Sequence, residues 1–242
     1  MFNIFRKSRP KLLEYIPKGF VDIHSHILPG IDDGCKNNKE SIELIRKLKK
    51  IGFAKLIGTP HTYSGLYDNT NESIETSYLN LKKDIDDNIV IDYASEYFLE
   101  YSLIEKSERK TLLTLKENYV LVEMGFISEP IDLFDIIFNL QLNGYSVVLA
   151  HPERYLFLLN NLKMLYKLKN VGCMFQINLF SIVGYYGPKV LDFTNQLLDE
   201  KLVDFFGTDI HRINQVKILE ESVKINNYSA SEFIFERNNI FN

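Results

Sequence analysis

The chain of 242 residues is 45% hydrophobic and 25% charged, which is the composition of an ordinary globular protein with one sizeable core. Its formal net charge of −4 gives no basic surface of the kind that binds nucleic acid, so no nucleic-acid partner is expected. No apolar run approaches the length of a membrane span, so no stable membrane span is expected either.

The two cysteines, Cys35 and Cys173, are too few for a disulfide framework and suit a reducing compartment, which predicts a cytoplasmic location. Neither is followed six residues later by an arginine, because Ser41 and Leu179 stand at those positions. The Cys-x5-Arg loop of thiolate phosphatases is therefore absent. Any phosphatase chemistry in this chain needs a nucleophile other than a cysteine thiolate.

Residues 1–19 form a basic extension. They include one acidic residue, Glu14, and the basic residues Arg6, Lys7, Arg9, Lys11 and Lys18. A signal peptide would need an unbroken apolar core after its positive start, and this segment has none. We expect a solvated extension that packs loosely on a single domain of residues 20–242, rather than a membrane or partner contact.

From residue 20 onward, apolar strand-like runs alternate with helical patterns. Strands are predicted at residues 21–24, 54–59, 89–95, 119–122, 146–150, 173–177 and 202–206. Helices are predicted at 38–51, within 69–87, at 130–144, up to 170 and at 188–201, with one or two more in the tail. Asn38 and Gly52 are the candidate caps of the first of these helices, and Pro130 and Gly144 bound the third. Residues 97–118 suggest short helical pieces and a turn.

This alternation predicts the fold class. Mostly apolar strands between helices imply a parallel sheet that is covered by helices on its outside. About seven strand–helix units in this length favour a closed barrel over a small open sheet. We therefore predict an α/β fold, a distorted (β/α)7-like barrel in one domain, in which the carboxyl ends of the strands meet on one face.

A histidine pair stands at the end of the first predicted strand. His24 and His26 are two residues apart, so in an extended chain they project from the same face. The carboxylates Asp32 and Asp33 follow on a loop rich in glycine and proline, whose backbone can fold back. Imidazole nitrogens with carboxylate oxygens are the ligand set of a borderline or hard divalent metal.

Other ligand-type residues follow the remaining strands. All five histidines and three acidic residues do so: His24, His26, His61, His151, His211, Glu96, Glu123 and Asp209. In a barrel these side chains would converge, which predicts a metal site. Glu123 follows the run Tyr-Val-Leu-Val, and a carboxylate in such a setting must be paired, protonated or coordinated.

Several of these residues have a plainer interpretation. Glu96 suits a loop acid as well as a ligand, and Asp32 fits a turn residue better than a ligand. Arg154 suits either a structural ion pair or a phosphate group, for which its planar fork is well shaped. Five tyrosines on the predicted rim are mostly expected to pack, with one or two able to contact an aromatic substrate: Tyr63, Tyr67, Tyr155, Tyr185 and Tyr186.

Together, the motifs resemble the PHP (polymerase and histidinol phosphatase) superfamily. The motifs are His-Ser-His with Asp-Asp-Gly, Thr-Pro-His, Leu-Val-Glu, His-Pro-Glu-Arg and Thr-Asp-Ile-His, in this order over residues 20–240. More closely, the chain is similar to the bacterial manganese-dependent protein-tyrosine phosphatases of capsule and exopolysaccharide systems, the CpsB/YwqE type. One departure is Thr208, where many relatives have serine before the aspartate. The ligand pair that follows is intact.

The resemblance implies a PHP barrel with three metal ions, manganese first, with Fe, Zn, Co or Mg as alternatives. His24, His26 and Asp209 would hold the first ion, Glu96 would bridge it to the second, and Glu123 and His151 would complete the second. Asp33, His61 and His211 would hold the third. Arg154 would bind the substrate phosphate, and Arg154, Asp209 and His61 form the expected catalytic set.

The implied activity is a protein-tyrosine phosphatase that uses a metal-activated water and forms no covalent phosphoenzyme. Its substrate would be a phosphotyrosine-bearing protein, namely an autophosphorylated bacterial tyrosine kinase with a tyrosine-rich tail, and its role the control of capsule and exopolysaccharide production. Two alternatives remain open. One is a PHP-type phosphatase for a small ester such as histidinol phosphate. The other is a metal-binding partner of the kinase without turnover.

Overall fold

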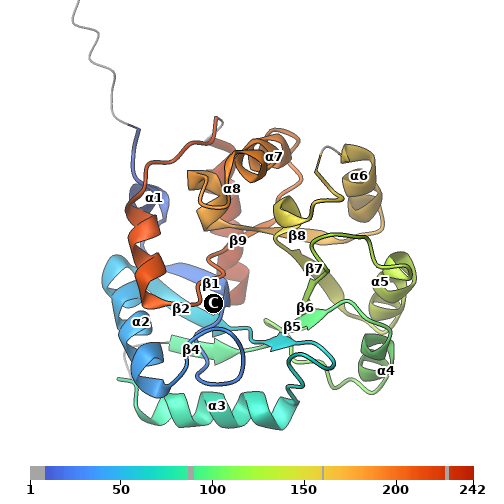
Figure 1. Ribbon diagram of the computed structural model, residues 1–242, viewed down its shortest axis with the longest axis horizontal. Helices are drawn as coiled ribbons and strands as arrows, with labels where there is room; N and C mark the ends of the chain where they lie inside the picture. Colours follow the sequence, from blue (N-terminus) through green and yellow to red (C-terminus); the bar gives the residue numbers. More distant parts are fainter. Residues whose placement is uncertain (1–8, 87–89, 160, 227–228) are drawn as a thin grey trace, which may run out of the picture.

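The computed structural model describes residues 9–86, 90–159, 161–226 and 229–242, and it arranges them as parallel strands surrounded by helices (Figure 1). The strands are β1 (Phe20–Ser25), β2 (Phe53–Gly58), β3 (His61–Thr62), β4 (Val90–Tyr93), β5 (Glu96–Phe98), β6 (Tyr119–Glu123), β7 (Ser146–Ala150), β8 (Met174–Asn178) and β9 (Phe205–Gly207). They form two parallel sheets, in the orders β1-β2-β4 and β3-β5-β6-β7-β8-β9.

The division into two sheets comes from two broken strands. The second predicted strand corresponds to β2 and the third to β4; after breaks at Thr59 and Pro60 and at Ala94 and Ser95, the chain continues as the short strands β3 and β5, which were not predicted. Proline has no N–H to donate to a neighbouring strand, although the carbonyl of Pro60 accepts from the N–H of Glu96 at 3.0 Å. Because β2 pairs with β4 and β3 with β5, the breaks lie side by side and the barrel is distorted there.

The barrel closes between its first and last strands. The N–H of Asp209 donates to the carbonyl of His24 at 2.8 Å, and a parallel bridge joins Ser25 to Ile210. The buried carboxylate of Asp22 adds side-chain bonds: it accepts from the N–H of Thr208 at 2.9 Å and from its hydroxyl at 2.5 Å. The prediction of a distorted α/β barrel in one domain is confirmed.

Helices cover the outside of the strands (Figure 1). The α-helices are α1 (Leu12–Tyr15), α2 (Asn38–Ile51), α3 (Asn71–Lys83), α4 (Ser102–Glu108), α5 (Leu133–Leu142), α6 (Leu162–Asn170), α7 (Pro188–Asp199) and α8 (Ser229–Arg237). The 3-10 helices are η1 (Pro152–Arg154), η2 (Leu179–Val183), η3 (Ile213–Glu220) and η4 (Asn238–Phe241). Among the described residues, no helix is both long enough and apolar enough to cross a membrane.

The helix ends differ from the predictions in detail. Asn37, not Asn38, caps α2 by accepting from the N–H of Glu40, while Gly52 ends the helix at a φ of 113° as predicted. α5 begins at Leu133 rather than near Pro130, whose carbonyl instead accepts from the N–H of Leu133 at 3.3 Å in the turn before the helix.

Some strand and helix limits also differ from the predicted ones, and some predicted limits lie outside the described residues. The last strand begins at Phe205 rather than at residue 202, and β5 extends into the region from residue 97 onward that was predicted to be helical pieces. The predicted limits at residues 87 and 89, and residue 160 before α6, lie outside the described residues.

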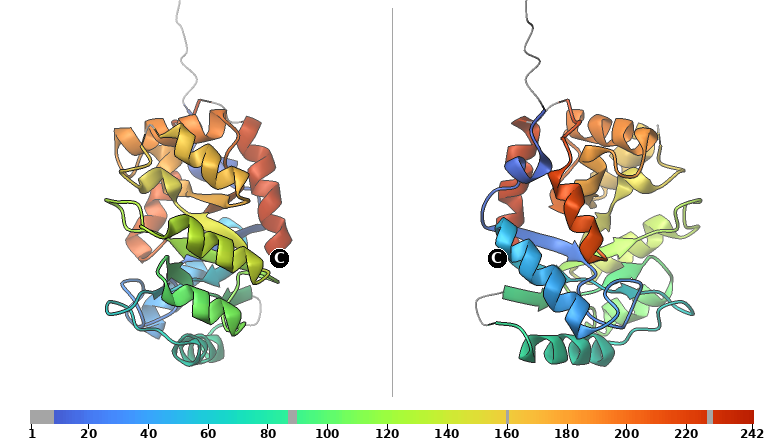
Figure 2. Two further views of the ribbon diagram at one scale, coloured as in Figure 1. Left: turned by 90° about the vertical axis from the view of Figure 1, so that its right-hand side faces the viewer. Right: turned by 60° about the vertical axis from the view of Figure 1, so that its left-hand side comes forward.

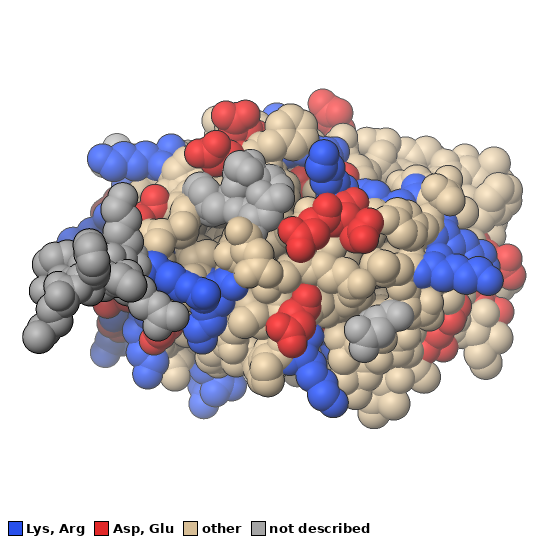
Figure 3. All heavy atoms as spheres, turned by 90° about the horizontal axis from the view of Figure 1, so that it is seen from above, with Lys and Arg blue, Asp and Glu red and all other residues tan. Residues whose placement is uncertain are grey.

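The described part of the N-terminal segment packs more closely than predicted. Leu12 is fully buried, and its N–H donates to the carbonyl of Glu221 at 2.9 Å. The N–H of Val223 donates in turn to the carbonyl of Pro10 at 3.0 Å, so α1 lies beside η3 (Figures 1 and 2). Arg6 and Lys7 lie outside the described residues. The surface seen in Figure 3 has clusters of basic and of acidic side chains next to one another.

Two hydrophobic clusters lie on opposite sides of the strands. The larger fills the space between strands and helices. The smaller fills the barrel with residues from β1, β2, β6, β7 and β9, and Phe241 of η4 belongs to it. The ring of Phe241 lies 5.2 Å from that of Tyr119 and 5.0 Å from that of Phe205, at the amino ends of β6 and β9. Phe241 therefore closes the end of the barrel opposite the predicted site.

We expect Phe241→Ala to lower the free energy of unfolding by about 3–5 kcal/mol, because truncating a buried phenylalanine removes apolar contacts and leaves a cavity. Denaturant unfolding measures the change. Ile240→Ala is the matched control, since this side chain is 44% exposed and its loss should cost no more than about 1 kcal/mol. Equal stability of Phe241→Ala and the unaltered protein would contradict the role of Phe241 in closing the barrel.

Candidate metal centre

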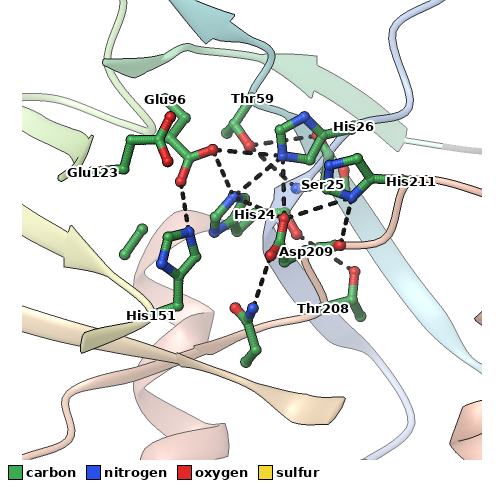
Figure 4. Close-up of polar contacts among 12 residues, drawn as sticks. His24, Ser25, His26, Thr59, Glu96, Glu123, His151, Thr208, Asp209 and His211 are labelled. Carbon is green, nitrogen blue, oxygen red and sulfur yellow. Dashed lines mark hydrogen bonds and ion pairs between the residues drawn. The ribbon is translucent and has the colours of Figure 1, made fainter. Parts of the chain in front are cut away.

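Ligand-type side chains from separate strands meet at the carboxyl end of the barrel (Figure 4). The first two come from β1 and the residue that follows it, and the others from β3, β5, β6 and the loops after β7 and β9: His24, His26, His61, Glu96, Glu123, His151, Asp209 and His211. Asp33, on the loop after β1, faces them, because its Oδ1 lies 3.3 Å from Nε2 of His211. The predicted convergence is therefore present in the structure.

Three histidines are held with one ring nitrogen toward this cluster. Nδ1 of His24 lies 2.8 Å from Oε1 of Gln176, and Nδ1 of His26 lies 2.7 Å from Oδ2 of Asp32. Nδ1 of His211 lies 2.8 Å from the backbone oxygen of Asp209. These oxygens accept, so in the neutral ring each Nδ1 holds the hydrogen and each Nε2 holds a lone pair. Metal-ligating histidines are oriented in this way.

The positions of the Nε2 atoms fit a cation. Nε2 of His24 and Nε2 of His26 are 3.4 Å apart, and they lie 3.4 and 3.2 Å from Oδ1 of Asp209. Two lone pairs at this distance repel each other unless a cation lies between them. The donor set of imidazole and carboxylate groups suits a divalent metal.

Glu96 lies at the centre of the cluster. Its carboxylate oxygens lie 3.2 Å from Nε2 of His24, 3.1 Å from Nδ1 of His61 and 3.0 Å from Nε2 of His151. Burial alone would raise the pKa of Glu96, but His24 and His61 hold it well below its usual range. Glu96 is therefore an anion that requires positive charge around it.

Glu123 shows the opposite shift. Burial raises the pKa of its carboxyl, and repulsion from Glu96 raises it further. Its closest basic partner is His61, at 2.8 Å. Within the described residues, Oε2 of Glu96 and Nδ1 of both His61 and His151 are buried and make no hydrogen bond, although Nδ1 of His61 lies 2.8 Å from Glu123 and 3.1 Å from Glu96. Coordination of a cation would satisfy such atoms, because it stabilises buried anions and lone pairs together.

Ligand atoms in the structure form overlapping groups that could each hold an ion. The groups are His26, Asp33, His61 and His211; His24, His151 and Asp209; His24, His26 and Glu96; and His61, Glu96 and Glu123. The residues predicted for the third ion thus lie in one group. His151 lies with His24 and Asp209, and Glu123 lies with His61.

Two of these residues have a backbone conformation that is uncommon outside glycine. His151 has a φ of 37° and Asp209 a φ of 54°. His151 lies directly after β7, and Asp209 lies two residues after the end of β9, where the chain turns. Such a conformation is strained at a non-glycine residue and recurs at functional sites, where the surroundings enforce it.

Arg154 lies beside the cluster on η1. Its NH1 donates to Oδ2 of Asp209 at 2.7 Å, and its guanidinium carbon lies 4.8 Å from the ring centre of Phe126 and 4.5 Å from that of Tyr186. It lines a hollow of about 320 Å³ together with Tyr185, Tyr186, Asp209 and others. The guanidinium is therefore held between two rings and bonded to a cluster carboxylate, at the edge of an open surface depression.

Three further predicted residues have different surroundings. Asp32 belongs to none of the ion-holding groups: it accepts from the N–H of Gly34, as a turn residue does, and also orients His26. Tyr155 is fully buried, and its hydroxyl donates to the carbonyl of Ala150, so it is not a rim residue. Tyr67 stacks on His61, with ring centres 5.2 Å apart.

Residues that the sequence analysis missed surround the predicted ones. Phe126 packs on Arg154, and Gln176 and Asn178 of β8 bond His24 and Asp209. Glu153 is fully buried, and its Oε1 accepts from the N–H of Asn178 at 2.9 Å and from the hydroxyl of Ser181, which joins η1 to η2. The only signal in the sequence is their position in or shortly after a predicted strand.

A parallel α/β barrel with a cluster of imidazole and carboxylate ligands at the carboxyl ends of its strands defines a candidate metalloenzyme. Over residues 20–227 the chain matches the model of a family described as capsular polysaccharide synthesis, CpsB/CapC. The chain belongs to this family.

Named relatives and a solved structure agree with the family match. Tyrosine-protein phosphatase YwqE of Bacillus subtilis (strain 168) is 32% identical over 200 residues, which cover 80% of this chain and 78% of the relative. Tyrosine-protein phosphatase CpsB of Streptococcus pneumoniae is 30% identical over 203 residues, or 80% of this chain and 84% of the relative.

The structural similarity is to the crystal structures of YwqE from Bacillus subtilis and CpsB from Streptococcus pneumoniae, described as unique metal-dependent tyrosine phosphatases. The TM-score is 0.75 at 29% sequence identity, and the match covers 89% of this chain and 85% of the other.

We expect Mn²⁺ to stabilise the protein and Glu96→Ala to remove most of this effect. At about 100 times its Kd, a ligand of the folded state adds about 2.7 kcal/mol, which corresponds to a rise in Tm of about 5–10 °C for a chain of this size. Melting curves with Mn²⁺ and with chelator measure the rise. Glu72→Ala, an exposed position on α3, should keep it. A Glu96→Ala protein with an unchanged rise would exclude Glu96 from the ion site.

Proposed function

We propose that this chain is a metal-dependent tyrosine phosphatase that hydrolyses phosphotyrosine on a protein substrate. The observation that carries the proposal is the position of Arg154, which is bonded to the cluster carboxylate Asp209 and lines an open hollow. A cluster of metal ligands next to a guanidinium suits a phosphate monoester, since both bind anionic oxygens. The activity named for YwqE and CpsB is the same, which supports the proposal.

We further propose three ions in this site, manganese first, with Fe, Zn, Co or Mg as alternatives. The proposed ligands are His24, His26 and Asp209 for the first ion, Glu96 between the first and second, Glu123 and His151 for the second, and Asp33, His61 and His211 for the third. The joint grouping of the last three residues supports this assignment. Such ions, when bound, lower the pKa of a coordinated water and offset negative charge on the phosphoryl oxygens.

The residues of the chain itself would bind and orient the substrate. Arg154 can give N–H groups to a phosphate, and the rings of Phe126 and Tyr186 hold its plane in place. The phenolate that leaves from phosphotyrosine has a conjugate-acid pKa of about 10, so it needs less protonation than an alkoxide. Cys35 and Cys173 are buried free thiols, which supports transfer to water rather than to a cysteine.

The shape of the rim favours a protein substrate over a small metabolite. Tyr185 lines the hollow and is 51% exposed, and Phe126, which packs on Arg154, is 40% exposed. An open rim with aromatic and apolar side chains can accept a phosphotyrosine with the residues around it. A phosphatase for histidinol phosphate would instead enclose its substrate on most sides.

We propose that the substrate is an autophosphorylated bacterial tyrosine kinase and that the setting is the control of capsule and exopolysaccharide production in the cytoplasm. The family description supports the link to capsule synthesis. The two free cysteines support a reducing compartment. Within the chain, we assign residues 20–242 to the phosphatase domain and residues 1–19 to a basic extension of it.

We expect phosphate release from a phosphotyrosine peptide in the presence of Mn²⁺, none with chelator, and none from histidinol phosphate. His24→Ala should abolish release while the protein stays folded, because this histidine faces both Glu96 and Asp209. Release from histidinol phosphate alone would move the activity to a small metabolite. If neither compound releases phosphate although metal is bound, the role of a non-catalytic partner of the kinase is favoured.

We expect Arg154→Ala to raise KM for the phosphopeptide by about tenfold or more, because a hydrogen bond to a charged group contributes about 1.5–3 kcal/mol. Arg154→Lys should restore only part of the loss, since an ammonium has neither the fork nor the flat face that stacks between rings. Arg46→Ala, at an exposed ion pair on α2, is the control. An unchanged KM in Arg154→Ala would support a purely structural ion pair with Asp209.

A further inference from the structure

Two buried amides of β8 connect two of the proposed metal ligands. Oε1 of Gln176 lies 2.8 Å from Nδ1 of His24, and Nε2 of Gln176 lies 3.0 Å from Oδ1 of Asn178. Nδ2 of Asn178 lies 2.8 Å from Oδ2 of Asp209. All four side chains are buried. A continuous series of hydrogen bonds, which we call the amide relay, therefore runs from His24 through Gln176 and Asn178 to Asp209.

The direction of every bond in the amide relay is determined at one end. Arg154 can only donate, and its NH1 lies 2.7 Å from Oδ2 of Asp209, so this oxygen is an acceptor. Asn178 must then present its NH2 group to Asp209 and its oxygen to Gln176. This oxygen accepts from the NH2 group of Gln176, which leaves Oε1 of Gln176 to face His24.

An amide oxygen can only accept, so His24 must hold its hydrogen on Nδ1. Nε2 of the neutral ring then has its lone pair toward Oε2 of Glu96 and Oδ1 of Asp209, 3.2 and 3.4 Å away. The opposite tautomer would place a lone pair of His24 against the oxygen of Gln176. A flip of the Gln176 amide would satisfy that ring but would place its oxygen against the oxygen of Asn178.

Packing also holds His24 and Gln176 close to the backbone of β9. Gly207 on β9 lies against both His24 and Gln176: a Cβ at this position would lie 2.7 Å from Cβ of His24 and 3.0 Å from Nε2 of Gln176. Because glycine has no side chain, the two groups can approach the β9 backbone closely. The amide relay therefore lies in a tight space, and its bonds fix the direction of each amide.

We propose that Gln176 and Asn178 are positioning residues that fix the tautomer of His24 and the orientation of Asp209 toward one metal ion. The inference rests on the proposed metal centre and adds the residues that prepare it. Neither amide needs to touch the substrate. Their effect is on metal affinity, because a ligand that is already in its binding tautomer and orientation loses less freedom when the ion binds.

The test is calorimetric titration of the full-length protein with Mn²⁺. Gln176→Met replaces the amide by an apolar chain of similar length that offers no amide oxygen to His24, and we expect it to raise the Kd for Mn²⁺ by about 10–100-fold. Asn178→Leu removes the second amide of the amide relay, which bonds Asp209, and should raise the Kd for Mn²⁺ by a similar factor. Gln176→Glu keeps an oxygen for Nδ1 of His24, so it should bind Mn²⁺ more tightly than Gln176→Met.

A matched control separates affinity from stability. Asn238 is another fully buried amide, and its described bonds go only to the backbone of β1 and β9, at Val21 and Phe206. Asn238→Leu should lower the Tm but leave the Kd of the folded protein unchanged.

The outcomes distinguish this inference from the proposed function. If folded Gln176→Met and Asn178→Leu bind Mn²⁺ with the Kd of the unaltered protein, the positioning role is wrong while the metal centre stands. If the unaltered protein itself binds no Mn²⁺, the proposed metal centre fails and the inference fails with it. If Asn238→Leu weakens Mn²⁺ binding as much as Gln176→Met, the effect is one of general stability and the inference is overturned.

Discussion

The closure of the barrel between β1 and β9 is the interaction on which the site depends. It joins residues near the two ends of the chain, and it places the histidines of β1 next to Asp209. The buried carboxyl of Asp22 is part of this closure: burial raises its pKa to about 6, and its bonds to Thr208 and to the N–H of His24 oppose the shift. A buried carboxyl is costly unless such bonds compensate for lost water. The hydroxyl of Thr208 makes one of these bonds.

The second constraint is charge. The cluster brings carboxylates together at a buried position, and the protein alone balances them with histidines and with Arg154. The pKa of His61 shows how strongly these carboxylates attract positive charge. Burial would lower this pKa, yet Glu96 and Glu123 raise it to about 10. Burial has the largest effect on His151, and it lowers the pKa of this imidazole to about 4. A site in which one imidazole is drawn toward protonation and another is kept neutral is suited to cations that replace the missing positive charge.

Much of the fold and of the cluster could be predicted from the sequence, because strands buried on both faces are continuous apolar runs and a ligand-type residue follows most of them. The runs before Glu123 and His151 are examples. Other features leave no such pattern. The break at Pro60 depends on pairing with the neighbouring strand, and the burial of Leu12 is hidden among basic residues. The proposed roles of Gln176 and Asn178 could not be predicted, because an amide in a strand belongs to no periodic pattern. Its role depends on the residues to which it hydrogen-bonds.

Asp209 has a further consequence because its two oxygens have different partners. Oδ1 faces His24 and His26, whereas Oδ2 bonds Arg154 and Asn178. An anion that binds Arg154 therefore changes the charge that the same carboxylate presents to an ion on its other side. Thermodynamic linkage makes the effect reciprocal: the factor by which an anion changes ion affinity is the factor by which the ion changes anion affinity. In the proposed site, retention of released phosphate and occupancy by metal would thus be coupled equilibria, connected through a single side chain.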